Sequence, residues 1–181
     1  MIPNVKIHIG QYFATKNSTS ISTVLGSCVS VCLFDPVMKI GGMNHILHSG
    51  ESLGSIDDSG RYGVNAMELL INEMISLGAM RNRLVAKVFG GGNILGLSNK
   101  HQQGHRNVDF VLNFLKVDEI QIVSQNTGGR FSRKIFFQSD TSEVLLKKTT
   151  SKMQANLPQE KNTASIRVKS ISDKSGEITL F

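Results

Sequence analysis

Two apolar segments joined by a turn, between residues 22 and 47, constrain the fold of this chain more than any other feature. The run Val29–Phe34 has the length and the β-branched content of a buried strand. Asp35-Pro36 follows it directly, and this pair favours a turn because proline presets φ and aspartate bonds to the turn backbone. Gly41–Leu47 then provides a second strand. The segment therefore predicts an antiparallel β-hairpin within a larger sheet.

The rest of the chain alternates between strand-like and helix-like patterns. Apolar residues recur at helical spacing in residues 62–77 and 107–115, which predicts two helices. Further strands are expected at residues 1–10, 84–89, 120–123, 133–137 and 144–147. This order favours an α/β fold, a single layered domain with a mixed β-sheet and at least two helices.

The composition changes after about Thr149. Residues 150–163 are polar, include Pro158 and show neither helical nor strand periodicity. We therefore expect one domain at residues 1–149, followed by a linker and C-terminal tail at residues 150–181. Two short amphipathic pieces of the tail, Ile166–Ile171 and Glu177–Phe181, are interpreted as either extra strands or a docking segment.

Composition and charge exclude several classes of protein. No apolar run approaches the roughly 20 residues of a membrane-spanning helix, and the first ten residues alternate like a strand, unlike an export signal. We expect a cytoplasmic protein without membrane insertion. The net charge is +6, but the chain has no tryptophan and two tyrosines, so nucleic-acid binding is not expected.

Two further motifs do not predict a cofactor. Gly90-Gly91-Gly92 follows a strand but lacks the spacing of a phosphate-binding loop, which favours close backbone packing beside an active site. His101 and His105 are four residues apart, but no third ligand accompanies them. We expect neither a metal nor an organic cofactor.

Cys28 and His45 lie at the open end of the expected hairpin. If Asp35 pairs with Met38 across the turn, Cys28 lies directly opposite His45, with Cβ atoms about 5 Å apart. A neighbouring imidazole can lower the pKa of a thiol and later protonate a leaving amine. The pair is a candidate nucleophile and general base. The alternatives are a buried core thiol, a structural histidine, and a β-bulge at Gly41-Gly42 that changes the register.

Residues beside this pair are candidates for supporting roles. Gly26, Ser27 and Asn44 are candidate oxyanion-binding or substrate-binding residues, because Gly26 and Ser27 precede the thiol and Asn44 precedes the imidazole. Ser22 or Thr23 is a candidate to orient the imidazole through its other ring nitrogen.

Several segments together resemble the CheD family, the glutamine deamidases of chemotaxis receptors. The resemblance covers roughly residues 5–148, in the segments Leu25–Pro36, Gly41–Leu47, Tyr62–Met67, Ala86–Gly91, Gly104–Asn107 and Gly128–Lys134. It implies a cysteine-hydrolase fold similar to that of glutamine-deamidating toxins. It also implies that Cys28 is the nucleophile, that His45 is the general base, and that Ser22 or Thr23 supplies the third group.

The reaction that the resemblance implies is that of a protein-glutamine glutaminase. The Cys28 thiolate attacks a glutamine carboxamide, ammonia leaves, and water hydrolyses the thioester to glutamate. The implied partners are methyl-accepting chemotaxis receptors, whose methylation helices are the substrate, and a phosphatase of the CheC type. A thiol hydrolase for another amide or ester, or a non-catalytic adaptor that binds receptors or the phosphatase, are the alternatives.

The chain departs from the family pattern at two places. Asn126 stands where many members have an aspartate, and His48-Ser49 replaces the usual Leu-Pro after the histidine motif. Neither departure changes the candidate nucleophile or base.

Overall fold

The structure is a computed structural model, which describes residues 2–47, 56–94, 103–150 and 178–181. Its helices are α1 (Ile56–Ser76) and α2 (Gln103–Val117), with a short 3-10 turn at Arg81–Arg83. The predicted helices started at residues 62 and 107, where the apolar periodicity begins. Both helices of the structure start earlier, at Ile56 and Gln103. Neither helix combines the length and hydropathy that crossing a lipid bilayer requires.

The strands form two five-stranded sheets. Sheet A contains, in spatial order, β1 (Asn4–Lys6), β3 (Ser20–Leu25), β8 (Phe131–Gln138), β9 (Val144–Thr150) and β10 (Ile178–Leu180). Sheet B contains β2 (Tyr12–Thr15), β5 (Ile40–Asn44), β4 (Val29–Asp35), β6 (Val85–Gly90) and β7 (Gln121–Thr127). Each sheet is mixed, because β1 is parallel to β3 and β6 is parallel to β7.

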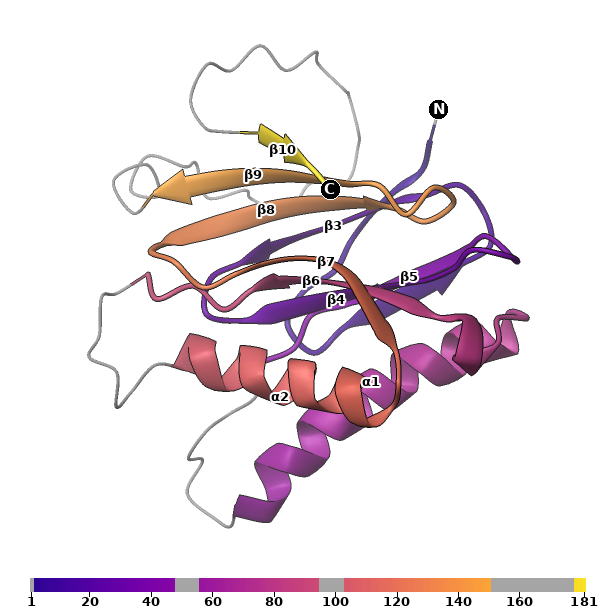
Figure 1. Cartoon of the computed structure of the whole chain (residues 1–181). Helices are drawn as coiled ribbons and strands as arrows, with labels where there is room; N and C mark the ends of the chain where they lie inside the picture. The colour runs from indigo at the N-terminus through magenta and orange to yellow at the C-terminus, as the bar shows by residue number, and fades with distance from the viewer. Residues whose placement is uncertain (1, 48–55, 95–102, 151–177) are drawn as a thin grey trace.

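These elements stack in three layers, with the two helices on one face of sheet B and sheet A on the other (Figure 1). One apolar core fills the space between the helices and sheet B, and a second fills the space between the sheets. The predicted α/β domain with mixed pairing and two helices is confirmed, but its strands divide between two sheets. Glycines at positive φ help the chain cross between them, as at Gly128-Gly129 between β7 and β8.

Strand β4 is central to sheet B, and all seven of its residues are buried. Alternate residues face the two cores: Val31 packs on the helix side, whereas Cys32 packs between the sheets. Burial on both faces explains why this segment is a continuous apolar run in the sequence. Cys28, just before the strand, also faces the space between the sheets.

The turn between β4 and β5 differs from the predicted one. Asp35 pairs with Ile40, not with Met38, so the predicted register is wrong by two residues. A two-residue hairpin turn needs positive φ at its central residues, and Pro36 cannot adopt it. The chain instead uses a four-residue connection that ends on Lys39 at φ 51°.

The buried carboxylate of Asp35 organises this end of the molecule. It accepts five hydrogen bonds, from the backbone N–H groups of Val37, Met38 and Met80 and from two nitrogens of Arg83. Burial by itself raises the pKa of Asp35, but these hydrogen bonds together hold the pKa below its usual value. One side chain thus ties the hairpin turn to the chain between α1 and β6.

The last residues of the chain pack on sheet A. Ile178–Leu180 pairs with β9, and Phe181 exchanges both backbone hydrogen bonds with Val144. The Phe181 ring meets Phe89 edge-on, with centroids 5.6 Å apart. Of the two amphipathic pieces of the tail, this one forms a strand, and Ile166–Ile171 lies outside the described residues. The division of the chain near residue 149 stays a prediction.

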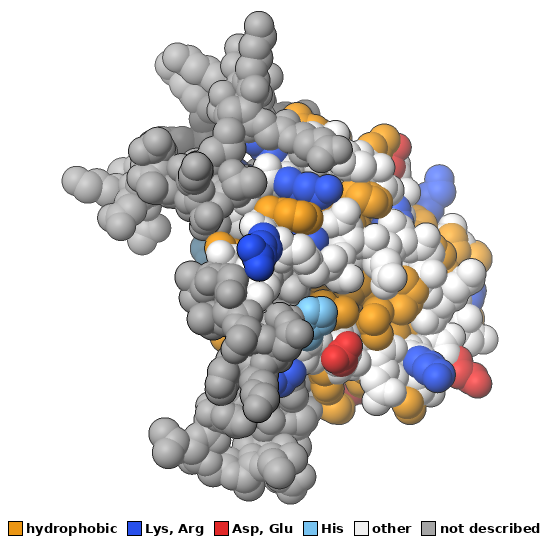
Figure 2. Space-filling model, turned by 60° about the vertical axis from the view of Figure 1, so that its left-hand side comes forward, with side chains coloured by type: hydrophobic (Ala, Val, Ile, Leu, Met, Phe, Trp, Pro, Cys, Tyr) orange, Lys and Arg blue, Asp and Glu red, His pale blue; other side chains and the backbone are white. Residues whose placement is uncertain are grey.

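Charged side chains are spread over the described part of the face that Figure 2 shows. On the face that Figure 2 shows, lysines and arginines lie among uncharged groups and small hydrophobic clusters. The net positive charge is therefore not gathered into one stripe on that face.

Candidate active site

The candidate residues gather at one end of the two sheets. Thr23 lies in β3 of sheet A, His45 directly follows β5 of sheet B, and Cys28 directly precedes β4. The backbone bridge between Val29 and Ile46 continues the β4–β5 register to this end. Because an even shift in register keeps each side chain on its face, Cys28 and His45 still share the face toward sheet A.

The two residues are diagonal neighbours in this register. Extended by one residue from the Val29–Ile46 bridge, the register sets Cys28 across from Leu47, two positions from His45. Diagonal positions on one face are roughly 7 Å apart, within reach of an imidazole ring. The predicted directly opposed pair is therefore replaced by a diagonal one.

A short contact between the sheets fixes the ring of His45. Thr23 Oγ1 lies 2.8 Å from His45 Nδ1 and 2.8 Å from the carbonyl oxygen of Ile7. The carbonyl can only accept, so the Thr23 hydroxyl donates to Ile7 and accepts a hydrogen bond from Nδ1–H. This assignment places the ring proton on Nδ1 and leaves the lone pair on Nε2. That buried nitrogen has no hydrogen-bond partner among the described residues.

Ser22 does not contact the histidine. Its hydroxyl donates to the side-chain oxygen of Asn4 at 3.3 Å. Successive side chains of a strand point to opposite faces, so only one of the two adjacent hydroxyls can meet His45. Of the two candidates, the structure brings Thr23 to the imidazole.

The glycine run packs against the loop that carries Cys28. Gly91 donates its N–H to the carbonyl oxygen of Cys28 at 2.8 Å. A Cβ at Gly90, where φ is +116°, would lie 2.2 Å from the same oxygen, so a larger residue cannot fit. The predicted close backbone packing of this run beside Cys28 is confirmed.

The residues before the thiol are held by their carbonyl groups. Gly92 donates its N–H to the carbonyl of Gly26, and the Asn107 amide donates to the carbonyl of Ser27 at 2.6 Å. Asn107 is fully buried and 80 residues from Ser27 in sequence. No motif near the cysteine indicates it; the available signal is a polar residue on the buried side of α2, one turn before Val111.

Asn44 lies on the other side of sheet B. Its side-chain oxygen accepts from the backbone N–H of Val31 at 3.0 Å, and its nitrogen donates to the carbonyl of Ala66 in α1 at 3.3 Å. The amide thus links sheet B to a helix. The structure does not bring it to the thiol.

Burial disfavours the charged forms of both Cys28 and His45. It raises the pKa of the Cys28 thiol, and a hydrogen bond from the backbone of Cys28 offsets part of that change. Burial, and to a smaller extent the neighbouring His8, lower the pKa of His45 from 6.5 to about 4. At neutral pH the resting pair is therefore a thiol and a neutral imidazole.

Two of the sequence expectations concern residues that the structure does not describe. His101 and His48-Ser49 lie outside the described residues. Within residues 2–47, 56–94, 103–150 and 178–181, no three His, Cys, Asp or Glu side chains group as a metal site would require.

Comparisons with known proteins point to one family. The family model described as "CheD chemotactic sensory transduction" matches residues 48–148. A "Probable chemoreceptor glutamine deamidase CheD 1" of Shewanella oneidensis is 43% identical over 98% of this chain and 87% of its own length. A "Probable chemoreceptor glutamine deamidase CheD 2" of Chromobacterium violaceum is 40% identical over 99% of this chain and 90% of its own.

One solved structure has a distant likeness to the chain. The Bacillus licheniformis hypothetical protein YfiH has a TM-score of 0.45 and 14% sequence identity. The match covers 66% of this chain and 51% of that one.

Proposed function

The chain belongs to the CheD family, and on this premise we propose that it deamidates glutamine side chains of chemotaxis receptors. Its relatives are named probable chemoreceptor glutamine deamidases. The match covers 87% and 90% of their length, which supports the same enzymatic activity here. The enzyme is an amidohydrolase that converts specific glutamines of the receptors to glutamate.

One observation supports the chemical mechanism more than any other. The Thr23 hydroxyl holds Nδ1–H of His45, which leaves Nε2 as a proton acceptor on the face that also carries Cys28. We propose that Nε2 removes the thiol proton as Sγ attacks the glutamine carboxamide. Because burial disfavours both charged forms at rest, the proton moves during the attack and not before it.

The remaining steps use the same groups. The carbonyl oxygen of the substrate becomes negatively charged, and backbone N–H groups of the loop at Gly26–Cys28 are proposed to stabilise it. The imidazolium then protonates the NH2 group as the C–N bond breaks, so that ammonia leaves and the thioester remains on Cys28. Water, deprotonated by neutral His45, hydrolyses the thioester and releases the glutamate side chain.

The function is tested by mass spectrometry of a receptor cytoplasmic fragment incubated with the protein. We expect the mass of specific glutamine residues to increase, because deamidation replaces the amide NH2 group with an OH group. Peptide mapping identifies the sites, and a fragment incubated without the protein controls for spontaneous deamidation. If no glutamine changes while the fragment still binds, the proposal is wrong and a non-catalytic adaptor is favoured.

The assignment of the third catalytic group is tested by substituting each of the two adjacent hydroxyl residues in turn. Thr23→Val keeps the side-chain shape but leaves Nδ1–H of His45 without its acceptor, so we expect kcat to fall on the order of 10²-fold. Ser22→Ala is the matched control and should retain nearly full activity, because Ser22 bonds to Asn4 instead. Steady-state kinetics on the receptor fragment measure both variants. A larger loss in Ser22→Ala would contradict the assignment.

The pH dependence of the reaction reports the state of the pair. With the pKa of His45 at about 4, the neutral base is present above that pH, so kcat/KM should be nearly flat from about pH 5 to 8. Alkylation of Cys28 by iodoacetamide should keep accelerating as pH rises, because burial raises the thiol pKa. A plateau of the alkylation rate from pH 5 upward would instead indicate a resting thiolate–imidazolium pair.

We also propose the cytoplasm as the place of action and a CheC-type phosphatase as a partner. Both cysteines are free and buried, as suits a reducing compartment. The phosphatase rests on the family resemblance alone, and co-purification of the two proteins tests it.

A further inference from the structure

Three consecutive carbonyl groups anchor the loop that carries Cys28. The carbonyl groups of Gly26 and Cys28 accept backbone N–H groups of the glycine run, each at 2.8 Å. The carbonyl group between them, that of Ser27, instead accepts the side-chain amide of Asn107 at 2.6 Å. One of the three anchors is therefore a side chain, which a substitution can remove without changing the backbone of the loop.

The packing of α2 brings Asn107 to this carbonyl group. Gly104, one turn earlier on the same face of the helix, packs so closely on Gly91 that a Cβ at Gly104 would collide with the Gly91 carbonyl group. Asn107 itself is fully buried, and its side-chain oxygen accepts a hydrogen bond from Gln103 at 3.2 Å. Its NH2 group is thus left to donate to Ser27, whose carbonyl can only accept.

The bond from Asn107 sets the direction of the next N–H group. In a trans peptide the C=O and N–H groups point in opposite directions, and no described peptide bond is cis. Helix α2 lies on one face of sheet B, whereas the Cys28 side chain packs on the other, between the sheets (Figure 1). The Ser27 carbonyl is directed toward α2, so the Cys28 N–H is directed toward the side of the thiol.

The N–H group of Cys28 is available to a substrate. Among the residues that the structure describes, this N–H has no hydrogen-bond acceptor in another residue. The carbonyl oxygen of a carboxamide gains negative charge when Sγ attacks it, and an N–H donor that is already in place stabilises that charge. The stabilisation requires that the peptide between Ser27 and Cys28 keeps its orientation.

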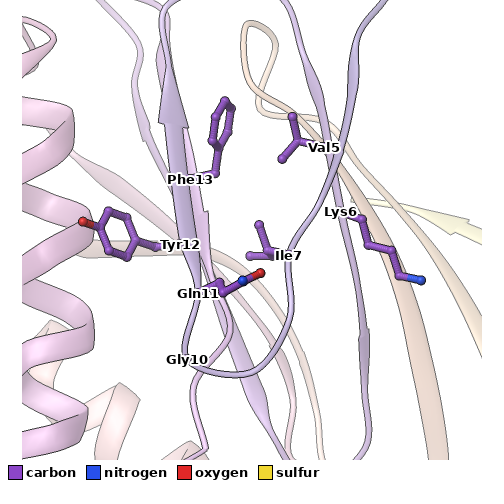
Figure 3. Close-up of a pocket in the computed structure, with 7 residues that line it drawn as sticks. All are labelled: Val5, Lys6, Ile7, Gly10, Gln11, Tyr12 and Phe13. Carbon is purple, nitrogen blue, oxygen red and sulfur yellow. The ribbon is translucent and has the colours of Figure 1, made fainter. Parts of the chain in front are cut away.

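The general base is held by a different segment. Gly10 and Gln11 lie in a bend of the chain just before β2, as Figure 3 shows. Gly10 donates its N–H to the carbonyl of His45, and His45 donates its N–H to the carbonyl of Gln11. A substitution of Asn107 therefore changes the support of Cys28 and leaves the support of His45 in place.

We propose that Asn107 is a positioning residue for the reaction, an inference that rests on the proposed function. Its amide holds the Ser27 carbonyl group and thereby directs the Cys28 N–H at the carbonyl oxygen of the glutamine under attack. It acts through the loop and not on the reacting atoms. Because that oxygen gains its charge only as the C–S bond forms, loss of the Asn107 amide slows the chemical step and leaves substrate binding nearly unchanged.

Asn107→Asp tests the inference with a side chain of almost the same shape. A carboxylate cannot donate to the Ser27 carbonyl, so we expect kcat for the receptor fragment to fall on the order of 10²-fold, with KM little changed. Asn113→Asp is the matched control, because Asn113 is exposed on the same helix. We expect it to keep the kinetics of the wild-type protein.

The pH profile of Asn107→Asp provides a second readout. Burial raises the pKa of the new carboxyl group, and its protonated form can donate a hydrogen bond again. Activity relative to the wild-type protein should therefore recover as pH falls toward about 5. His45 remains a neutral base at that pH, since its pKa is about 4. A purely structural role of Asn107 would not produce this recovery.

Two small probes of Cys28 separate positioning from a general structural role. With p-nitrophenyl acetate the C–S bond forms, His45 accepts the thiol proton, the carbonyl oxygen carries negative charge, and p-nitrophenolate then leaves. Iodoacetamide alkylates the same sulfur by displacing iodide, without a charged carbonyl oxygen. We expect Asn107→Leu, which removes the donor and adds no charge, to slow acylation on the order of 10²-fold and alkylation less than about twofold. Cys28→Ala measures the reaction of both probes with other groups.

The outcomes separate this inference from the function on which it rests. An unchanged acylation rate, or acylation and alkylation slowed together, overturns the positioning role. A wild-type thiol that is alkylated but not acylated overturns it as well. If acylation alone is slowed but the wild-type protein deamidates no glutamine, the positioning role stands and the proposed function fails. Thermal unfolding checks the fold, and each of the two Asn107 variants replaces the other in both assays if one of them is unstable.

Discussion

Cys28→Ala abolishes deamidation of the receptor fragment, with an expected loss in kcat on the order of 10⁵-fold. The alanine has no group that can form the thioester, and neutral His45 alone cannot replace it. Binding of the fragment should persist, because the substitution removes one sulfur atom and leaves the rest of the surface unchanged. Mass spectrometry measures the turnover, and a binding assay with the same fragment measures the affinity.

The second cysteine supplies the matched control. Cys32 faces the same core between the sheets, is 1% exposed, and its thiol pKa is raised by burial, with a smaller opposing effect of Lys87. We expect Cys32→Ala to retain activity, since a wholly buried neutral thiol cannot reach a substrate. Substantial turnover in Cys28→Ala, or its loss only in Cys32→Ala, would contradict the assignment of the nucleophile.

Asp35→Ala lowers the free energy of unfolding by an expected 3–5 kcal/mol, roughly the cost of removing one partner from a buried ion pair. The carboxylate is 0% exposed, and its partner Arg83 is 27% exposed. The substitution leaves the guanidinium and three backbone N–H groups without their acceptor. The hairpin turn and the segment before β6 lose their common anchor.

Urea unfolding followed by circular dichroism measures this effect. Asp118→Ala is the matched control, because Asp118 also pairs with an arginine, Arg81, but is 22% exposed. We expect that control to cost about 1 kcal/mol or less. A loss in Asp35→Ala no larger than in Asp118→Ala would show that the buried carboxylate is not an anchor.

The same carboxylate makes a contribution that depends on pH. Its pKa in the folded protein is lower than the unfolded value of 3.8, so its contribution to stability is present above that pH. It is lost as pH falls through the lower folded pKa. His45 acts in the same direction between pH 6.5 and about 4, because the unfolded chain takes up a proton that the buried imidazole does not.

The local elements and the shared face of Cys28 and His45 could be predicted because their signals are short in range. Apolar periodicity identified both helices, and the continuous apolar run at Val29–Phe34 identified a strand that is buried on both faces. The positions of Cys28 and His45 on either side of the hairpin turn identified them as residues that share a face. The predicted register was wrong by two residues, and an even shift keeps each side chain on its face. The prediction that Cys28 and His45 share a face therefore holds although the predicted turn was wrong.

Contacts between distant segments could not be predicted from the sequence. Whether Ser22 or Thr23 meets the imidazole depends on which face of β3 packs against sheet B. The amide of Asn107 reaches Ser27 only because α2 packs on the end of sheet B. These contacts depend on the placement of whole layers, about which neighbouring residues carry little information.

The amino-acid sequence by itself determined that this protein is an α/β domain with a thiol and an imidazole at one end of a hairpin. Periodicity and turn chemistry act over a few residues, so they are visible in the chain. Only the tertiary structure decided that the strands form two sheets, that the Thr23 hydroxyl contacts His45, and that the Asn107 amide reaches Ser27. Burial and packing between layers set those features, and they exist only when segments far apart in the chain come together.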